Sequence, residues 1–137
     1  MAEIPQKITV EVVTPERRVI TRECDEVILP GTLGSFGVLP GHAAMLSSLQ
    51  PGVAVVRTGN EKSIMAVGGG FAEVLPDRVI VLAETCEKSD EIDVERAKQA
   101  IAEWEQKLRS ASAETDIDVV RVKILKHSER ISATQWR

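Results

Sequence analysis

VIVLAETCEKSDEIDVERAKQAIAEWEQKLRSA, residues 79–111, contains the point at which the hydrophobic period of this 137-residue chain changes. The segment opens on VIVLA, a β-branched and aliphatic run typical of a buried strand. After Asp93, which is expected to cap a helix N-terminus, apolar residues recur at intervals of three and four. These residues are Val94, Ala97, Ile101, Trp104, Leu108 and Ala111. The stretch therefore separates a strand region from a helical region.

Upstream of this stretch the sequence predicts many short strands. Gly and Pro recur roughly every 8 to 12 residues as far as Pro76, and neither occurs after Asp77. Between them lie short runs rich in Val, Ile and Leu, at residues 8–13, 27–29, 53–56, 64–67 and 79–82. Because no helix signal separates these runs, we expect a β-sandwich, or flattened antiparallel barrel, of about ten short strands.

Downstream, the sequence predicts a second helix. Thr115 is its expected N-cap, and Asp118 follows three residues later as in a capping box. Its apolar stripe consists of Ile117, Val120, Ile124 and Ile131. The short connection of residues 110–114 indicates an antiparallel helical hairpin. We therefore expect three segments: an N-terminal β-sandwich (1–86), a charged linker (87–91) and a C-terminal two-helix hairpin (92–137).

Composition excludes several classes of protein. A chain with 43% hydrophobic and 28% charged residues is globular, and its net charge of −4 and 3% aromatic content argue against nucleic-acid binding. No run approaches the roughly 20 apolar residues of a membrane-spanning helix, and no secretory signal precedes the first strand, so we expect a cytosolic chain with no bilayer insertion. Cys24 and Cys86 are too few for a disulfide framework, and with two histidines they make a poor metal site.

The sequence predicts no catalytic residues. The triplet at residues 68–70 has two interpretations, a phosphate-binding loop or a strand bend where two backbones approach closely. We favour the bend, because Phe71 and Ala72 stand where a phosphate loop needs Lys and Ser or Thr. No serine or cysteine has an acid–base partner in its local sequence, so an enzyme is the weakest of the interpretations considered.

A set of ordered motifs carries a family resemblance. These motifs are Val13-Thr-Pro15, Gly34-x-x-Gly-x-Leu-Pro-Gly-His42, Gly69-Gly70-Phe71-x-Glu-Val74, Val79-Ile-Val-Leu-Ala83 and Ile92-Asp-x-x-Arg-Ala97. Together they resemble the epsilon subunit of F-type ATP synthase, which is called delta in mitochondria. That family has a β-sandwich followed by a two-helix hairpin, the architecture that the hydrophobic pattern predicts on its own.

The resemblance implies a non-catalytic rotor subunit of the central stalk, peripheral to the cytoplasmic face of the bacterial plasma membrane. In similar proteins the sandwich binds the gamma subunit and the polar loops of the c-ring, and so links proton flow to ATP synthesis. The resemblance assigns the c-ring contact to Ser35 and His42. Ser35 stands where the family frequently has Glu, so this contact is expected to depend less on salt.

The resemblance also implies that the hairpin regulates the complex. In similar proteins the extended second helix sets basic residues against an acidic stretch of the beta subunit and blocks ATP hydrolysis. The candidates here are Arg121, Lys123, Lys126 and Arg130, and the alternative is a solvated helix face. Residues 84–105 carry a net charge of −5 and residues 116–137 carry +2, so these two segments are expected to attract each other when the hairpin is folded down.

Some bacterial relatives bind regulatory ATP on the folded hairpin, and no other cofactor is implied. The matching positions here are Glu87, Ile92, Asp93, Arg96 and Ala97. The further arginines of that pattern align near Ser128 and Ser132, and helix capping and surface packing also explain Asp93 and Arg96. The main alternative for the whole chain is a sandwich-plus-hairpin adapter of an unrelated cytosolic assembly.

Overall fold

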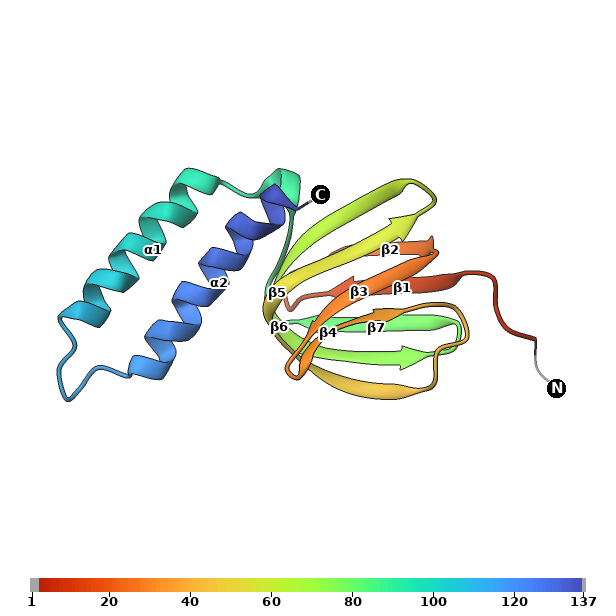
Figure 1. The fold of residues 1–137 in the computed structure, drawn as a ribbon, viewed down its shortest axis with the longest axis horizontal. Coiled ribbons are helices and arrows are strands. Elements are labelled where there is room, and N and C mark those ends of the chain that lie inside the picture. Colours follow the sequence, from red (N-terminus) through yellow and green to blue (C-terminus); the bar gives the residue numbers. More distant parts are fainter. Residues whose placement is uncertain (1–2, 137) are drawn as a thin grey trace.

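A computed structural model describes residues 3–136 and shows a sandwich-like β-sheet domain followed by a helical hairpin (Figure 1). The strands are β1 (Ile8–Val13), β2 (Arg18–Cys24), β3 (Glu26–Gly31), β4 (Gly34–Val38), β5 (Met45–Thr58), β6 (Glu61–Leu75), β7 (Arg78–Ala83) and β8 (Cys86–Lys88). A 3₁₀ helix, η1 (Ser89–Glu91), then leads to α1 (Val94–Arg109) and α2 (Ile117–Gln135). Both predicted regions and their order are confirmed.

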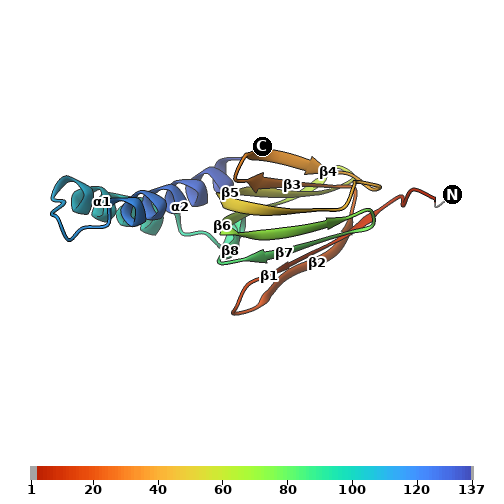
Figure 2. The ribbon, with the colours of Figure 1, turned by 90° about the horizontal axis from the view of Figure 1, so that it is seen from below.

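The strands form one mixed sheet that folds into two layers without closing (Figure 2). The order is β2-β1-β7-β6-β5-β3-β4, and β8 pairs with β6. The contact between β1 and β7 is parallel, whereas every other pairing is antiparallel. The described residues therefore form eight strands in a mixed sheet, rather than about ten in a purely antiparallel one.

The strand count is lower because β5 and β6 continue through two predicted turns. Pro51 pairs with Gly68, so both strands bend at the same level and pass together from one layer to the other. Gly69 and Gly70 have φ values of +107° and +136°, which favour glycine. A Cβ at Gly70 would strike the carbonyl oxygen of Leu82. The predicted strand bend with close backbone approach is therefore confirmed.

The core lies between the two layers and is almost wholly aliphatic. Its largest fully buried side chains are Ile8, Leu29, Met65, Val10, Val12, Val27, Val38, Val56, Val67, Val74, Val79 and Val81. Cys24 and Cys86 are buried as free thiols, and burial raises the pKa of each to about 11. Their position agrees with the cysteine count, which indicated thiols without a disulfide framework.

The helix caps agree with the sequence in one case and differ in the other. The Asp93 carboxylate accepts a hydrogen bond from the backbone N–H of Arg96 at 3.1 Å, as predicted for α1. Asp116, not Thr115, caps α2 by accepting from the N–H of Val119 at 3.2 Å. The Thr115 prediction was wrong because its hydroxyl accepts from the N–H of Ser112 at 3.1 Å, within the turn that joins the helices.

The hairpin contacts the sandwich through the C-terminal half of α2, and the loop between the helices points away (Figure 1). Ala133 of α2 is buried, Ser132 and Trp136 lie beside Pro51 and Gly52, and the Lys62 ammonium lies 5.0 Å from the centre of the Trp136 ring. Residues 87–91, the expected linker, form the end of β8 and η1. Because the link between the two regions is itself hydrogen-bonded secondary structure, it fixes where α1 begins.

Candidate functional site

Ser35 and His42 lie near opposite ends of β4, an edge strand of the sheet. Ser35 is exposed at the start of β4 and pairs with Pro30 across the β3–β4 turn. His42 is half-buried in residues 39–44, beyond the other end of β4. The Gly41 N–H donates to the Pro76 carbonyl at 2.7 Å and anchors this loop to the β6–β7 turn. The structure therefore places the two predicted c-ring residues along one free edge without bringing them into a single cluster.

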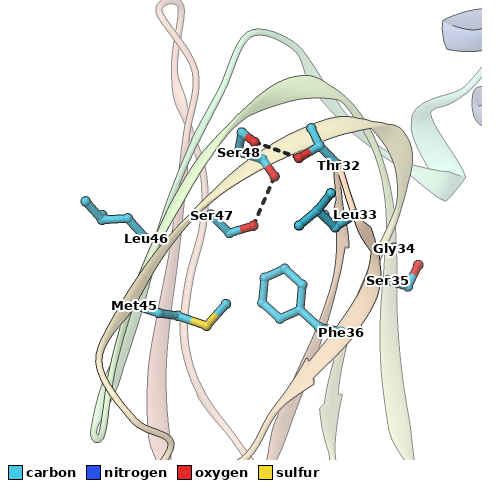
Figure 3. A pocket seen from close by; sticks show the side chains of 10 residues that line it. Thr32, Leu33, Gly34, Ser35, Phe36, Met45, Leu46, Ser47 and Ser48 are labelled. Atoms are coloured by element: carbon cyan, nitrogen blue, oxygen red, sulfur yellow. Dashed lines mark hydrogen bonds between the residues drawn. The ribbon is translucent and has the colours of Figure 1, made fainter.

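A groove borders this edge between the β3–β4 turn and the start of β5 (Figure 3). It measures about 480 Å³ and is lined by Gly31, Thr32, Leu33, Gly34, Ser35, Phe36, Met45, Leu46, Ser47 and Ser48. Phe36 and Met45 face each other across it, and the Thr32 and Ser48 hydroxyls are hydrogen-bonded at 2.7 Å. We call it the uncharged groove, because no lining residue carries a charge in a chain that is 28% charged.

Three apolar side chains project from the outer face of the sheet. Leu46 of β5 is 78% exposed, Phe71 of β6 is 64% exposed and Leu82 of β7 is 57% exposed. Phe71 pairs directly with Leu82, and Leu46 is two residues from the partner of Phe71. A second groove of about 390 Å³ extends this surface past Phe71 and Leu82 to Pro15. We call Leu46, Phe71 and Leu82 the apolar outer face, and contiguous exposed apolar surface of this kind marks interaction sites.

Sequence analysis did not identify the apolar outer face, although a signal was present. In β7 the whole segment from Val79 to Ala83 is apolar, so the expected alternation of apolar and polar residues is missing. Such a run is compatible with burial on both faces, so it does not by itself reveal which face is open. In the structure Val79 and Val81 are buried while Leu82 is exposed, so one face of this strand lies open among the described residues.

The basic candidates on α2 do not all share one face. Lys123, Lys126 and Arg130 follow one another at intervals of three and four residues and form one stripe, which we call the basic stripe. Arg121 is two residues from Lys123, so it lies on the other side of the helix and is exposed. The structure thus groups three of the four predicted residues.

The basic stripe meets an acidic residue of β8. The Arg130 Nη2 donates to Glu87 Oε2 at 3.1 Å, and Nε lies 2.8 Å from Oε1 as an ion pair without hydrogen-bond alignment. Burial, and then the charge of Lys123, lowers the pKa of Lys126. Burial and the neighbouring Arg130 lower the pKa of His127. The predicted attraction between residues 84–105 and 116–137 therefore takes the form of a strand–helix pair, whereas no ion pair among the described residues joins α1 to α2.

The predicted nucleotide set is not assembled as a phosphate site. Glu87 is occupied by Arg130, Asp93 caps α1, Ala97 is buried, and Arg96 is exposed. Ile92 is half-buried at the end of η1. No hydrogen bond or ion pair between residues 3 and 136 joins Asp93 or Arg96 to the basic stripe. A triphosphate needs several convergent cationic donors, so this arrangement of side chains does not fit one.

Two further kinds of site are not formed by residues 3–136. No group of three or more His, Cys, Asp or Glu side chains there is placed to hold a metal ion. None of the helices formed by these residues is both long and apolar enough to cross a membrane. The described part of the chain therefore offers the apolar outer face, the uncharged groove and the basic stripe as its candidate sites.

Comparison with known sequences identifies the family. The profile of the ATP synthase delta/epsilon chain β-sandwich domain matches residues 7–89, more than half of the chain. This chain belongs to the ATP synthase delta/epsilon family. The ATP synthase epsilon chain of Desulforamulus reducens is 42% identical over 91% of this chain and 95% of that protein. ATP synthase epsilon chain 2 of Syntrophotalea carbinolica is 48% identical over 76% of this chain and 75% of that protein.

A solved structure has the same fold. A chain in the cryo-EM structure of Euglena gracilis mitochondrial ATP synthase, comprising OSCP, F1 and the c-ring, aligns with a TM-score of 0.86 at 23% identity. The alignment covers 96% of this chain and 84% of that chain. The resemblance inferred from the ordered motifs is therefore confirmed, and the chain is an epsilon-type subunit of the ATP synthase central stalk.

Proposed function

We propose that this chain is a non-catalytic rotor subunit that joins gamma to the c-ring and restrains ATP hydrolysis through its hairpin. It acts as a peripheral part of the complex on the cytoplasmic face of the bacterial plasma membrane. Torque reaches gamma from the ring only if both partners are held firmly, so the sandwich needs two separate contact surfaces. The apolar outer face and the edge at β4 supply two such surfaces on different parts of the sheet.

The apolar outer face is the observation that carries this proposal. A side chain such as Phe71 contributes about 1.5–3 kcal/mol when a partner removes it from water, and three such side chains stand together here. Gamma is the partner that we propose for this face, because in similar proteins the sandwich binds gamma. Its apolar character suits a permanent contact, whereas a transient contact is typically more polar.

Co-purification with gamma tests this surface. Phe71→Ser should weaken recovery of the gamma complex strongly, whereas Glu61→Ser, an exposed change at the far end of the same strand, should leave recovery unchanged. Wild-type chain that fails to bind gamma would instead favour the adapter of an unrelated assembly. Equal recovery of both variants would remove the apolar outer face from the gamma contact.

For the c-ring, the proposed contact runs along β4 from Ser35 to His42, and the Ser35 side chain points away from the uncharged groove in Figure 3. Because Ser35 is exposed and uncharged, Ser35→Glu would add at most an exposed ion pair worth about 0–1 kcal/mol. Its association with the ring should therefore strengthen at low ionic strength and return to the wild-type level at high salt. Ser35→Gln has a similar size without the charge, so it should show no salt-dependent gain. A gain of equal size in both variants would argue against the electrostatic contact.

The inhibitory role is proposed for the basic stripe. While the hairpin is docked, Glu87 holds Arg130, so Arg130 is not free to engage an acidic segment of the beta subunit. Release of the hairpin would free that charge for the partner. A variant that ends at Glu91 keeps β8 and η1 while it lacks both helices. In the reassembled complex this variant should keep ATP synthesis and raise ATP hydrolysis; unchanged hydrolysis would remove the inhibitory role.

A further inference from the structure

The start of β5 has a backbone edge that no strand of the described residues covers. Residues Met45–Leu49 pair with β6 on one side, and β3 reaches the other side only at Leu49, through Gly31. The Thr32 N–H donates to the Ser48 carbonyl at 3.1 Å from that outer side. In an antiparallel ladder the N–H and C=O of one residue point the same way, and the direction alternates along the strand. The N–H and C=O of Leu46, two residues before Ser48, therefore point outward as well.

This open edge of β5 borders the uncharged groove. Phe36 and Met45 form its apolar floor and are only partly covered by the core, and Leu33 stands above them with its side chain fully exposed. In Figure 3 the Leu46 side chain points away from the groove, and this exposed residue belongs to the apolar outer face. The groove, the open edge and the apolar outer face thus meet at Leu46.

Exposed edges and open grooves are a hazard, because another chain can pair with them. Proteins usually protect such an edge with charged side chains, yet every residue that lines this groove is uncharged. An edge that is continuous with an apolar interaction surface, and that lacks this protection, indicates a site that is covered in the assembled complex.

We propose that an extended, uncharged segment of gamma adds to the open edge of β5 as a further strand. Its backbone pairs with the N–H and C=O of Leu46, and an apolar side chain enters the uncharged groove between Phe36 and Met45. A charged side chain would find no partner among the lining residues, so the groove selects against it. This inference rests on the proposed binding of gamma and adds the mode of recognition, which is strand addition.

A pair of substitutions at Leu46 separates backbone pairing from side-chain contact. Leu46→Ala removes the side chain and keeps the N–H, whereas Leu46→Pro removes both. Because this N–H points outward on an edge, the sandwich should accept proline there, and thermal unfolding checks that it does. With purified gamma, we expect Leu46→Pro to bind about tenfold more weakly than Leu46→Ala, as the loss of one buried backbone hydrogen bond requires.

Hydrogen exchange of the wild-type full chain keeps the inference testable even if the proline variant unfolds. The Leu46 amide should exchange freely in the isolated chain and become protected when gamma binds. Equal binding of the two variants together with an unprotected Leu46 amide would overturn strand addition while the proposed function stands. A wild-type chain that does not bind gamma would overturn the proposed function itself. Concentration-dependent dimers that Leu46→Pro abolishes would assign the edge to a second copy of this chain and overturn the assignment to gamma.

Discussion

Replacing Glu87 by glutamine should loosen the docked hairpin by a predictable amount. The substitution removes the charge that holds Arg130, whose side chain is 17% exposed against 35% for Glu87. Exposed ion pairs contribute about 0–1 kcal/mol, and hydrogen bonds to charged groups contribute about 1.5–3 kcal/mol. This partly buried pair combines one such hydrogen bond with an ion contact, so we expect a loss of about 1–2 kcal/mol in docking. That loss changes the ratio of docked to released hairpin by about 5- to 30-fold.

Amide hydrogen exchange along the last turns of α2 measures that ratio in the isolated chain. Exchange there should accelerate by about 5- to 30-fold in Glu87→Gln. Glu95→Gln is the matched control, because the Glu95 side chain is 82% exposed and its ion pair is with Lys98 of the same helix. In a double-mutant cycle with Arg130→Gln, the effects of the two substitutions should not add, because each removes the same interaction. Unchanged exchange in Glu87→Gln would refute a locking role for this pair.

Three further predictions concern titration, strain and thiol access. The pKa of His127 lies below its ordinary 6.5 in the docked hairpin, so docking should weaken as the pH falls below 6.5. Amide exchange in α2, measured at a series of pH values, checks this, and His127→Gln should remove the pH dependence of that exchange. Gly70→Ala should lower the free energy of unfolding, measured in urea, by about 2–5 kcal/mol, because the new Cβ would strike the Leu82 backbone. Gly59→Ala, at φ +60° with nothing close to the new Cβ, should lower it by about 1 kcal/mol. Because the pKa of Cys86 is raised to about 11, iodoacetamide labelling at pH 8 should require unfolding.

Local sequence patterns were sufficient to predict the order of the strands and helices and the residue at which α1 begins. Asp93 could be identified as a cap because the apolar helix stripe begins at the next residue, and both signals lie within one turn. The same logic failed at Thr115, because Thr115 and Asp116 are adjacent candidates with equivalent side-chain acceptors. The choice depended on the turn at Ser112, where the Thr115 hydroxyl is already used.

The long strands could not be predicted because their continuity is a property of pairing. Pro51 and Gly68 each indicate a turn when taken alone, and they are 17 residues apart in the chain. Once they face each other in register, the two signals describe one bend of a two-stranded ribbon. The pair between Glu87 and Arg130 has the same character, since it joins residues 43 apart with no local pattern between them.

The free energy of the Glu87–Arg130 pair is too small for this pair alone to control release of the hairpin. Moving a hairpin from about 99% docked to about 99% released takes roughly 5.5 kcal/mol, whereas the Glu87–Arg130 pair accounts for about 1–2 kcal/mol. The remainder must come from other contacts that a partner makes only with the released hairpin. An acidic partner that captured only Arg130 would therefore shift the population without completing the switch. Complete release therefore requires a partner that adds further contacts to the released helices, beyond the charge of Arg130.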